Sequence, residues 1–435
     1  MEVLINNLAK EYLHSLKVED EPTLDFVSFK ADDAAADSSG THSSATLGEI
    51  FYTKDEQSCC LLSESIFVKF GVISRRAYDI DVGLLFENEI HFYRNIYPFL
   101  DSVRSIEHLV PKFLAFKKDS NADGETVAIM LRRLGPEWVC HNYKSFMDYS
   151  HASMMVSPEC RDGGFRLQKI LQKKFSRQNI MDNFQNHSLQ GPENPSAAIT
   201  LQGVRKLGEL HAYSLAAKRK DASAFEKLSN FSANMLACVL PVYSAKMVAT
   251  LLKGLQPLRL VRRYREAVVR VDEMLHDFAD QVTKSYSRRP EDEHYVLGHL
   301  SYVQSNVLFR YEGGRPVDMK IVDWQSASFV SLGVDLIVTL YVDVGQQTRD
   351  VYWDRLLDNY HEALSSTFEN CDTPSRNEVV GELRHSVCAA FFMMAYRVLQ
   401  MNGKTSSDGR KYSHHIWNHK LITEMFEDLI DRGLL

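Results

Sequence analysis

Residues 294 to 344 contain side chains whose types and spacing suit phosphoryl transfer. A loop around His299 leads to Asn306, a predicted hairpin follows over residues 307–322, and Asp323 comes directly after it. In a kinase-type site a loop presents a catalytic base, while an Asn five positions later and an Asp after the next hairpin hold metal ions against the nucleotide phosphates. Carboxylate and amide oxygens suit Mg²⁺. The spacing therefore predicts a site for ATP and Mg²⁺, with Asn306 and Asp323 as metal ligands.

Ser301 stands five residues before Asn306, in the position where such a site needs its base. No Asp or Glu occurs from residue 294 to residue 311, so a shift of register does not supply one. A serine hydroxyl is too weakly basic to accept a substrate proton near neutral pH, and losing a general base costs on the order of 10²–10⁴ in rate. Because phosphoryl transfer depends mainly on positioning and metal electrostatics, slow turnover remains compatible with this sequence.

Two residues in the first quarter of the chain extend the pattern of a nucleotide site. Lys69 lies near the end of a predicted strand within residues 59–70, like the strand lysine that binds phosphates in kinases. Glu89 lies on a predicted helix over residues 84–96, where it could pair with that lysine, and Glu87 is an alternative partner. Taken alone, Lys69 could equally be an exposed lysine at a sheet edge. The order of the elements favours the nucleotide-binding role.

Two further nucleotide contacts are expected in the same part of the chain. The loop around Gly40 could cover the phosphates with its backbone N–H groups, although Gly40 and Gly48 form no recognised glycine fingerprint. Leu131, at the end of another predicted strand, would border the adenine.

Other polar residues of the C-terminal part have a structural interpretation. We expect His299 and His211 to bind backbone groups rather than to take part in chemistry. Asp335 should organise the loop that carries the base position, or cap a helix. Asn306 could be an ordinary turn residue, but its place before the hairpin favours metal ligation. Asp323 closes an apolar strand, where an acidic group is costly without a partner.

Periodicity predicts the elements that must position these residues. The chain should begin with an amphipathic helix and continue as a strand-rich part, whose later helix should end at Pro98. The part that follows residue 197 should be helical, and Pro257 should split its longest helix. Strands are predicted over residues 24–31, 47–53, 59–70 and 127–131, a loop over 34–45, and helices over 199–217, 245–284 and from 329 onward.

The order of these elements predicts an α+β chain with two lobes. A small strand-rich N-lobe should occupy residues 1–134, and a larger helical C-lobe should occupy residues 197–435 with its catalytic-loop hairpin at 295–325. Residues 135–196 are interpreted as an interlobe linker that contains an insertion. The insertion, residues 144–195, includes a basic stretch over 166–184 that we interpret as a solvated helix face.

Composition excludes several classes of protein. The chain has 435 residues, with 50 Lys and Arg against 57 Asp and Glu, which gives a formal net charge of −7. A general nucleic-acid-binding protein would normally show a basic excess, so no nucleic-acid partner is expected. The seven cysteines are odd in number and form no C-x-x-C pair, so a disulfide framework is not expected and a reducing compartment is favoured.

The N-terminus lacks the features of a secretory signal. Acidic residues interrupt it early, and no basic segment leads into an apolar run. No apolar run in the chain reaches the roughly 18 residues that span a membrane. We therefore expect a cytoplasmic protein without a membrane span.

These motifs together resemble the CHK kinase-like or ecdysteroid kinase-like family, whose distant relatives are choline and aminoglycoside kinases. The family's catalytic loop usually reads H-G-D-x-W-x-x-N and is followed by a hairpin and D-F-Q. The resemblance covers nearly the whole chain apart from the insertion. The matching segments are H-L-S-Y-V-Q-S-N at 299–306, V-D-M-K-I-V-D-W-Q at 317–325, F-E-N-E-I-H-F-Y at 86–93, L-H-A-Y-S at 210–214 and G-V-D-L at 333–336.

The resemblance implies a two-lobed, protein-kinase-like fold. It also implies a transferase ancestry: an ATP-dependent kinase acting on a hydroxyl of a small molecule, such as the steroids and xenobiotics linked to such proteins in insects. The family's catalytic Asp, however, falls on Ser301, and the preceding Gly on Leu300. Residues 132–134 also replace the acidic linker that the family often has. The combination suggests a pseudokinase that retains Asn306 and Asp323 for Mg²⁺–nucleotide binding, with an active kinase as the alternative. The sequence identifies neither the small-molecule ligand nor a protein partner.

Overall fold

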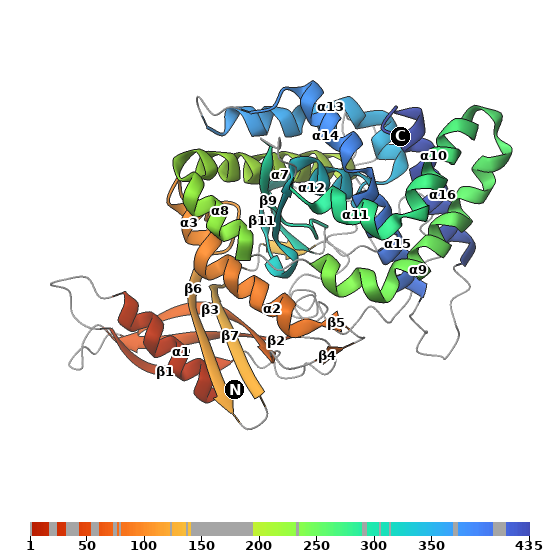
Figure 1. Cartoon of the computed structure of the whole chain (residues 1–435). Coiled ribbons are helices and arrows are strands. Elements are labelled where there is room, and N and C mark those ends of the chain that lie inside the picture. Colours follow the sequence, from red (N-terminus) through yellow and green to blue (C-terminus); the bar gives the residue numbers. More distant parts are fainter. Residues whose placement is uncertain are drawn as a thin grey trace, which may run out of the picture.

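The computed structural model gives the arrangement of both parts of the chain (Figure 1). It describes residues 2–16, 24–31, 43–53, 61–72, 76–77, 80–121, 124–135, 138–140, 195–231, 235–288, 294–303, 306–312, 315–368, 373–402 and 415–435. The loop around Gly40, the basic stretch at 166–184 and almost all of the 144–195 insertion lie outside these ranges.

The N-terminal part is built on a five-stranded antiparallel sheet with the strand order β1-β2-β3-β7-β6. The sequence predicts four of these strands but misses β6. Strand β2 also begins earlier than expected, within the predicted loop. The strands are β1 (Asp25–Ala31), β2 (Ser43–Thr53), β3 (Leu62–Val72), β6 (Phe113–Asn121) and β7 (Gly124–Arg132).

Helix α1 (Glu2–Ser15) packs on one face of this sheet (Figure 1). Successive side chains of a strand point to opposite faces. In β3, Ile66 and Val68 join the apolar core under α1. Phe67 packs against the other core, which the rest of the molecule shares. Lys69 has the same parity as Phe67, so the sheet presents it to the face that α1 leaves open.

The second helix of the N-terminal part differs from the prediction at its end. Helix α2 (Val82–His91) continues through a π-helical turn, η1 (Phe92–Ile96), into α3 (Tyr97–Asp101). Pro98 therefore does not end the helix; it occupies the first turn of α3, a position where proline is common. Two short strands, β4 (Arg76–Ala77) and β5 (Ile80–Asp81), precede α2.

The C-terminal part is mainly helical, as predicted. The predicted break near Pro257 is confirmed, because α9 ends at Leu255 and a 3₁₀ turn, η2 (Gln256–Leu260), follows it. The helices are α7 (Pro195–Lys220), α8 (Ala222–Phe231), α9 (Met235–Leu255), α10 (Arg265–His276), α11 (Phe278–Tyr286), α12 (Leu332–Val338), α13 (Gln346–Ser366), α14 (Arg376–His385), α15 (Val387–Asn402) and α16 (His415–Asp431).

Two small sheets lie inside this helical part. The predicted hairpin is present as β10 (Val307–Glu312) and β11 (Arg315–Ile321), and β8 (Trp138–Cys140) pairs with β10. The prediction of helix from residue 329 onward is wrong at its start. A strand, β12 (Ser328–Ser331), pairs there with β9 (Tyr295–Gly298), and α12 begins only after it.

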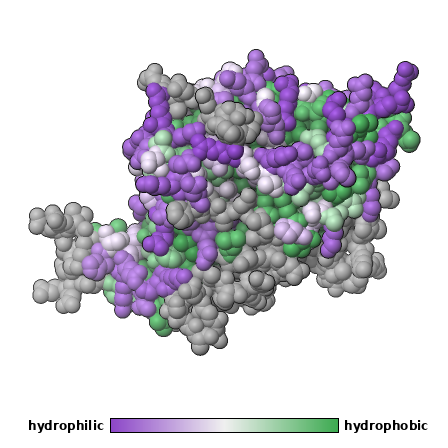
Figure 2. Space-filling model, viewed as in Figure 1, coloured by the Kyte–Doolittle hydropathy of each residue, from purple (hydrophilic) through white to green (hydrophobic). Residues whose placement is uncertain are grey.

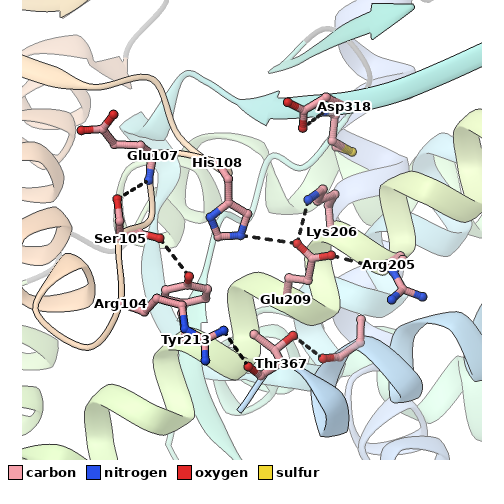
Figure 3. Close-up of polar contacts among 12 residues, drawn as sticks. Arg104, Ser105, Glu107, His108, Arg205, Lys206, Glu209, Tyr213, Asp318 and Thr367 are labelled. Atoms are coloured by element: carbon pink, nitrogen blue, oxygen red, sulfur yellow. Dashed lines mark hydrogen bonds and ion pairs between the residues drawn. The ribbon is translucent and has the colours of Figure 1, made fainter. Parts of the chain in front are cut away.

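The loop between α3 and β6 joins the two parts by polar contacts to α7 (Figure 3). The Tyr213 hydroxyl donates to the carbonyl of Ser105 over 2.9 Å. The Glu209 carboxylate lies 3.6 Å from the His108 ring nitrogen and 2.8 Å from the Lys206 ammonium. The helix that carries Glu209 is therefore tied directly to the segment that follows α3.

Helix α13 packs along α7 with an apolar face that includes Leu356 and Leu364. Its opposite face is hydrophilic, and hydrophilic residues cover much of the upper edge of the molecule in Figure 2.

A strand-rich sheet forms the smaller N-lobe, and a larger helical C-lobe surrounds the hairpin, which confirms the predicted α+β class. Within the described ranges, no helix is both long and apolar enough to cross a bilayer.

Candidate nucleotide and metal site

Lys69 lies between two carboxylates that come from distant parts of the chain. Its Nζ atom is 2.6 Å from Oε2 of Glu89 and 2.6 Å from Oδ1 of Asp323. Burial alone would lower the pKa of Lys69, but the charges and hydrogen bonds of Asp323 and Glu89 outweigh it and raise the pKa. The lysine is therefore a cation held at the junction of the sheet, α2 and the segment after β11.

The structure distinguishes between the two acidic residues that the sequence left open on α2. Glu89 contacts Lys69, and its side chain is only 2% exposed. Glu87 is exposed on the outer side of the helix. Burial raises the pKa of Glu89, while the Lys69 charge and a hydrogen bond from the Trp324 backbone act in the opposite direction. Glu89 is thus the acidic partner of Lys69.

Asp323 follows β11 directly and has a left-handed backbone, with φ 67° and ψ 63°. This conformation is costly for a residue with a Cβ atom, by roughly 1–2 kcal/mol. Both carboxylate oxygens accept hydrogen bonds, one from Lys69 and the other from Nε2 of Gln325 over 3.2 Å. The side chain remains 29% exposed, so it is a buttressed carboxylate that solvent or a ligand can still reach.

An aromatic column supports this turn. The Trp324 indole is fully buried and stacks on Phe92 with 3.9 Å between ring centroids and an angle of 4°. The His299 ring meets the same indole nearly edge-on at 4.7 Å. Side chains from η1, from the turn after β11 and from the loop around Ser301 therefore pack as one group.

Ser301 and Asn306 contact each other across the loop that was predicted to be catalytic. The Asn306 amide nitrogen donates to the carbonyl of Ser301 over 2.9 Å and to its hydroxyl oxygen over 3.2 Å. The Asn306 carbonyl accepts from the backbone N–H of Val322, which precedes Asp323. Asn306 thus connects the loop that contains Ser301 to the end of β11, as its predicted place between the loop and the hairpin requires.

His299 has the structural surroundings that were expected for it. Its Nε2 atom donates to the carbonyl of Val322 over 3.0 Å, and its Nδ1 atom accepts from the Ser301 backbone N–H over 3.3 Å. Since a carbonyl can only accept and a backbone N–H can only donate, these partners select the neutral ring with its proton on Nε2. Burial lowers the pKa of His299, which favours the same neutral form.

Asp335 binds the backbone of the loop that contains Ser301. Its two oxygens accept from the backbone N–H groups of His299, over 2.6 Å, and Leu300, over 2.8 Å. Burial acts to raise its pKa, but His211, 3.5 Å away, and these hydrogen bonds lower it overall. His211 in turn lies 2.6 Å from the Tyr360 hydroxyl.

Leu300 also has a left-handed backbone, with φ 57°. It occupies the place where the resembled family has Gly, a residue that adopts such angles freely. The side chain is buried in the core. The leucine is held at this left-handed angle because Asp335 accepts a hydrogen bond from its backbone N–H and the core buries its side chain.

The donor atoms at this site suit Mg²⁺. The Asp323 carboxylate and the amide oxygen of Asn306 are hard oxygen ligands, and Mg²⁺ is usually bound by one or two such side chains together with substrate phosphates. Among the described residues, no group of three or more His, Cys, Asp or Glu could form an all-protein metal cage. The side chains that are present therefore fit a metal that arrives with a nucleotide.

Leu131 lies on the face of the sheet opposite α1. It pairs with Phe67 in β3, two residues from the Ile129–Lys69 pair, and its side chain is buried in the core of the interlobe face. Its neighbour Arg132 binds Glu64, whose other oxygen accepts from the Tyr12 hydroxyl of α1. A nucleotide-binding role for Leu131 stays a prediction, as does the role of Gly40, which lies outside the described residues.

Sequence reasoning missed Asn88, which is buried on the inner face of α2. Its amide nitrogen donates to the carbonyls of Gln325 and Ala327. A signal was present in the sequence. Asn88 lies three residues after Leu85 and four before Phe92, so it is a polar residue within the apolar stripe of the helix.

Comparison with solved structures finds distant similarity along nearly the whole chain. A microcompartment-associated aminopropanol kinase is 11% identical, with 98% of each chain covered and a TM-score of 0.43. The GDP complex of wild-type aminoglycoside 2′-phosphotransferase-IIIa is 11% identical, with 98% of this chain and 99% of that chain covered and a TM-score of 0.40. An ethanolamine kinase of Plasmodium vivax is 12% identical, with 95% and 84% covered and a TM-score of 0.33.

No curated protein matches the chain. Residues 182–373 match the model of the ecdysteroid kinase-like family. This segment contains the loop with Ser301, the hairpin, Asn306 and Asp323. The resemblance to the ecdysteroid kinase-like family is therefore confirmed over residues 182–373 of this chain.

Proposed function

We propose that the protein binds a Mg²⁺–nucleotide between its two lobes and transfers the phosphoryl group poorly or not at all. The observation that carries the proposal is the position of Lys69, 2.6 Å from both Glu89 and Asp323. Kinases use a strand lysine, a helix glutamate and a metal-binding aspartate in this combination to hold nucleotide phosphates. In this proposal Lys69 binds phosphate, while Asp323 and Asn306 hold Mg²⁺.

We attribute the poor phosphoryl transfer to Ser301. Its hydroxyl oxygen accepts a hydrogen bond from the Asn306 amide, so it can position a group but cannot remove a proton from a substrate hydroxyl near neutral pH. Bound Mg²⁺ would supply charge stabilisation to the phosphates. The side chains of the protein would bind and orient the nucleotide. None of the site residues named above would act as a base toward the hydroxyl that accepts the phosphoryl group.

The second candidate is an active ATP-dependent kinase for a hydroxyl of a small molecule, such as a steroid or xenobiotic alcohol. It is favoured by the intact contacts among Lys69, Glu89 and Asp323, because phosphoryl transfer depends mainly on positioning and electrostatics. A cytoplasmic location is part of both candidates.

ATP consumption separates the two candidates. The native chain, Ser301→Asp, Ser301→Ala and Asp323→Ala are compared over a panel of steroid and other alcohols. The pseudokinase proposal expects background turnover for the native chain and for Ser301→Ala, and a gain only in Ser301→Asp. Brisk native turnover that Asp323→Ala abolishes would establish the active kinase instead.

A further inference from the structure

Helix α2 and the turn that follows Asp323 are joined by a buried polar contact. Asn88 is 4% exposed, and its side-chain amide nitrogen donates to the carbonyls of Gln325, over 3.0 Å, and Ala327, over 2.7 Å. One amide group thus uses both of its donor hydrogens on the backbone of a single turn.

A ring contact joins the same part of the molecule. Phe92, one turn after Asn88, stacks on the Trp324 ring at 3.9 Å. The helical segment therefore contacts Trp324, Gln325 and Ala327 through side-chain hydrogen bonds and a ring contact. The turn consequently has little freedom to shift without α2.

The turn needs such support because Asp323 is left-handed. A non-glycine residue adopts φ 67° only where the surrounding structure holds it there. The carbonyls that Asn88 binds belong to the residues two and four positions after Asp323. Fixing these groups fixes the direction in which the Asp323 carboxylate leaves the backbone.

We infer that Asn88 is a positioning residue that sets the Asp323 carboxylate for metal-dependent nucleotide binding. The inference rests on the proposed function, since Asp323 is the metal ligand there. Asn88 itself would touch neither the metal nor the nucleotide. Its loss should reduce the part of nucleotide binding that requires Mg²⁺ and spare the part that Lys69 supplies without metal.

The test uses the isosteric variant Asn88→Asp, which turns the donor toward two carbonyl oxygens into an acceptor. Asn88→Ala removes the donor without adding repulsion. Asn95→Asp is the matched control, because Asn95 is an exposed amide in the same helical segment that contacts His91. ADP affinity is measured for each folded variant with Mg²⁺ and again with EDTA, and the ratio of the two affinities is compared.

We expect the ratio to fall about tenfold or more in Asn88→Asp, to fall less in Asn88→Ala and to stay within twofold in Asn95→Asp. A purely structural role would lower both affinities together and leave the ratio unchanged, which would overturn the inference. A native chain whose ADP binding does not respond to Mg²⁺ would refute the proposed function, and the inference would fall with it.

Hydrogen exchange on the native chain provides a second measurement that needs no variant. If neither Asn88 variant folds, the backbone amides of α2 and of Trp324 are followed with and without Mg²⁺–ADP. If α2 and the turn are coupled, Mg²⁺–ADP should slow hydrogen exchange in both of them. Protection of Trp324 without any change in α2 would contradict the inference.

Discussion

Asp335 shows how one buried carboxylate organises the loop that carries Ser301. It accepts two backbone N–H groups, from His299 and Leu300, and it lies beside His211. A carboxylate that accepts several hydrogen bonds is stabilised in its charged form, which is the direction of its lowered pKa. The geometry of Ser301 and of the neighbouring Leu300 thus depends on a residue that has no expected contact with substrate.

Replacing Asp335 by Asn should destabilise the protein by about 3 kcal/mol, because charge-assisted hydrogen bonds are lost and the new amide N–H₂ faces a backbone N–H. Urea unfolding of Asp335→Asn measures the change. Asp354→Asn is the control, since its side chain is 84% exposed and its ion pair with Arg376 should contribute little. Equal stability of the two variants would contradict this role for Asp335.

Single residues could be predicted from the sequence where the local pattern dictates their position. Lys69 and Asp323 follow from strand ends, and Asn306 follows from its spacing to the hairpin. Glu89 could not be separated from Glu87, because two residues of a helix differ in burial only once the helix has packed. Asn88 is recognisable as a polar residue in the apolar stripe of its helix, but its partners are backbone carbonyls and could not be identified from the sequence.

Helices α7 and α13 approach each other closely at Gly208. A Cβ atom built on this residue would lie 2.5 Å from the carbonyl oxygen of Tyr360, a backbone atom that cannot move aside cheaply. At Gly203, which lies earlier on α7, an added Cβ atom would meet nothing within 4 Å. Close packing therefore requires a glycine at position 208, whereas the space around Gly203 would admit a larger residue.

Alanine substitutions should have opposite effects at the two positions. Gly208→Ala should destabilise the protein by about 1–3 kcal/mol, because the helix pair must separate to admit the methyl group. Gly203→Ala should stabilise it by about 0.5–1 kcal/mol, since alanine is the better helix former. Thermal unfolding of both variants gives the comparison, and a stabilising Gly208→Ala would mean that the two helices do not pack as described.

Helices and strands could be predicted where the apolar residues recur regularly. The prediction failed where contacts between distant segments determine the secondary structure. The helix break near Pro257 and the hairpin were both readable from the sequence. Strand β12 was not, because its apolar residues run directly into α12 and only pairing with β9 makes them extended. The end expected at Pro98 was wrong because a π-helical turn lets a new helix start there.

At the scale of the molecule, Glu209 contributes to the joint between the lobes (Figure 3). Burial acts to raise its pKa, but His108 and Lys206 lower it overall. A carboxyl with a folded pKa below its unfolded value adds stability above the unfolded pKa, near 4.3 for Glu. That stability is lost as the pH falls from there through the folded pKa.

Glu209→Gln should therefore be less stable than the native chain at pH 7, by about 1.5–3 kcal/mol, and the difference should shrink as the pH falls below about 4. Unfolding free energies measured between pH 7 and pH 3 check this. Glu362→Gln should change little, because Glu362 forms only an exposed ion pair with Arg205. A difference that stays constant with pH would show that the charge of Glu209 is not involved.

The two-lobed order could be predicted because the strands, Lys69, the helix with Glu89 and the hairpin occur along the chain in a fixed succession. What the sequence could not predict is how close distant residues come. Lys69 and Asp323 are 254 positions apart and meet at 2.6 Å. That contact depends on how the sheet packs on the helical lobe, which is a property of the whole molecule.

Nucleotide binding through Asp323 is tested most directly by a calorimetric titration of Mg²⁺–ADP into the native chain and into Asp323→Asn. The substitution keeps the shape of the side chain and removes the charge that would hold the metal. We predict a saturable binding signal for the native chain and an affinity at least about tenfold weaker for the variant. Native binding that is absent, or equal affinity of both chains, would contradict it.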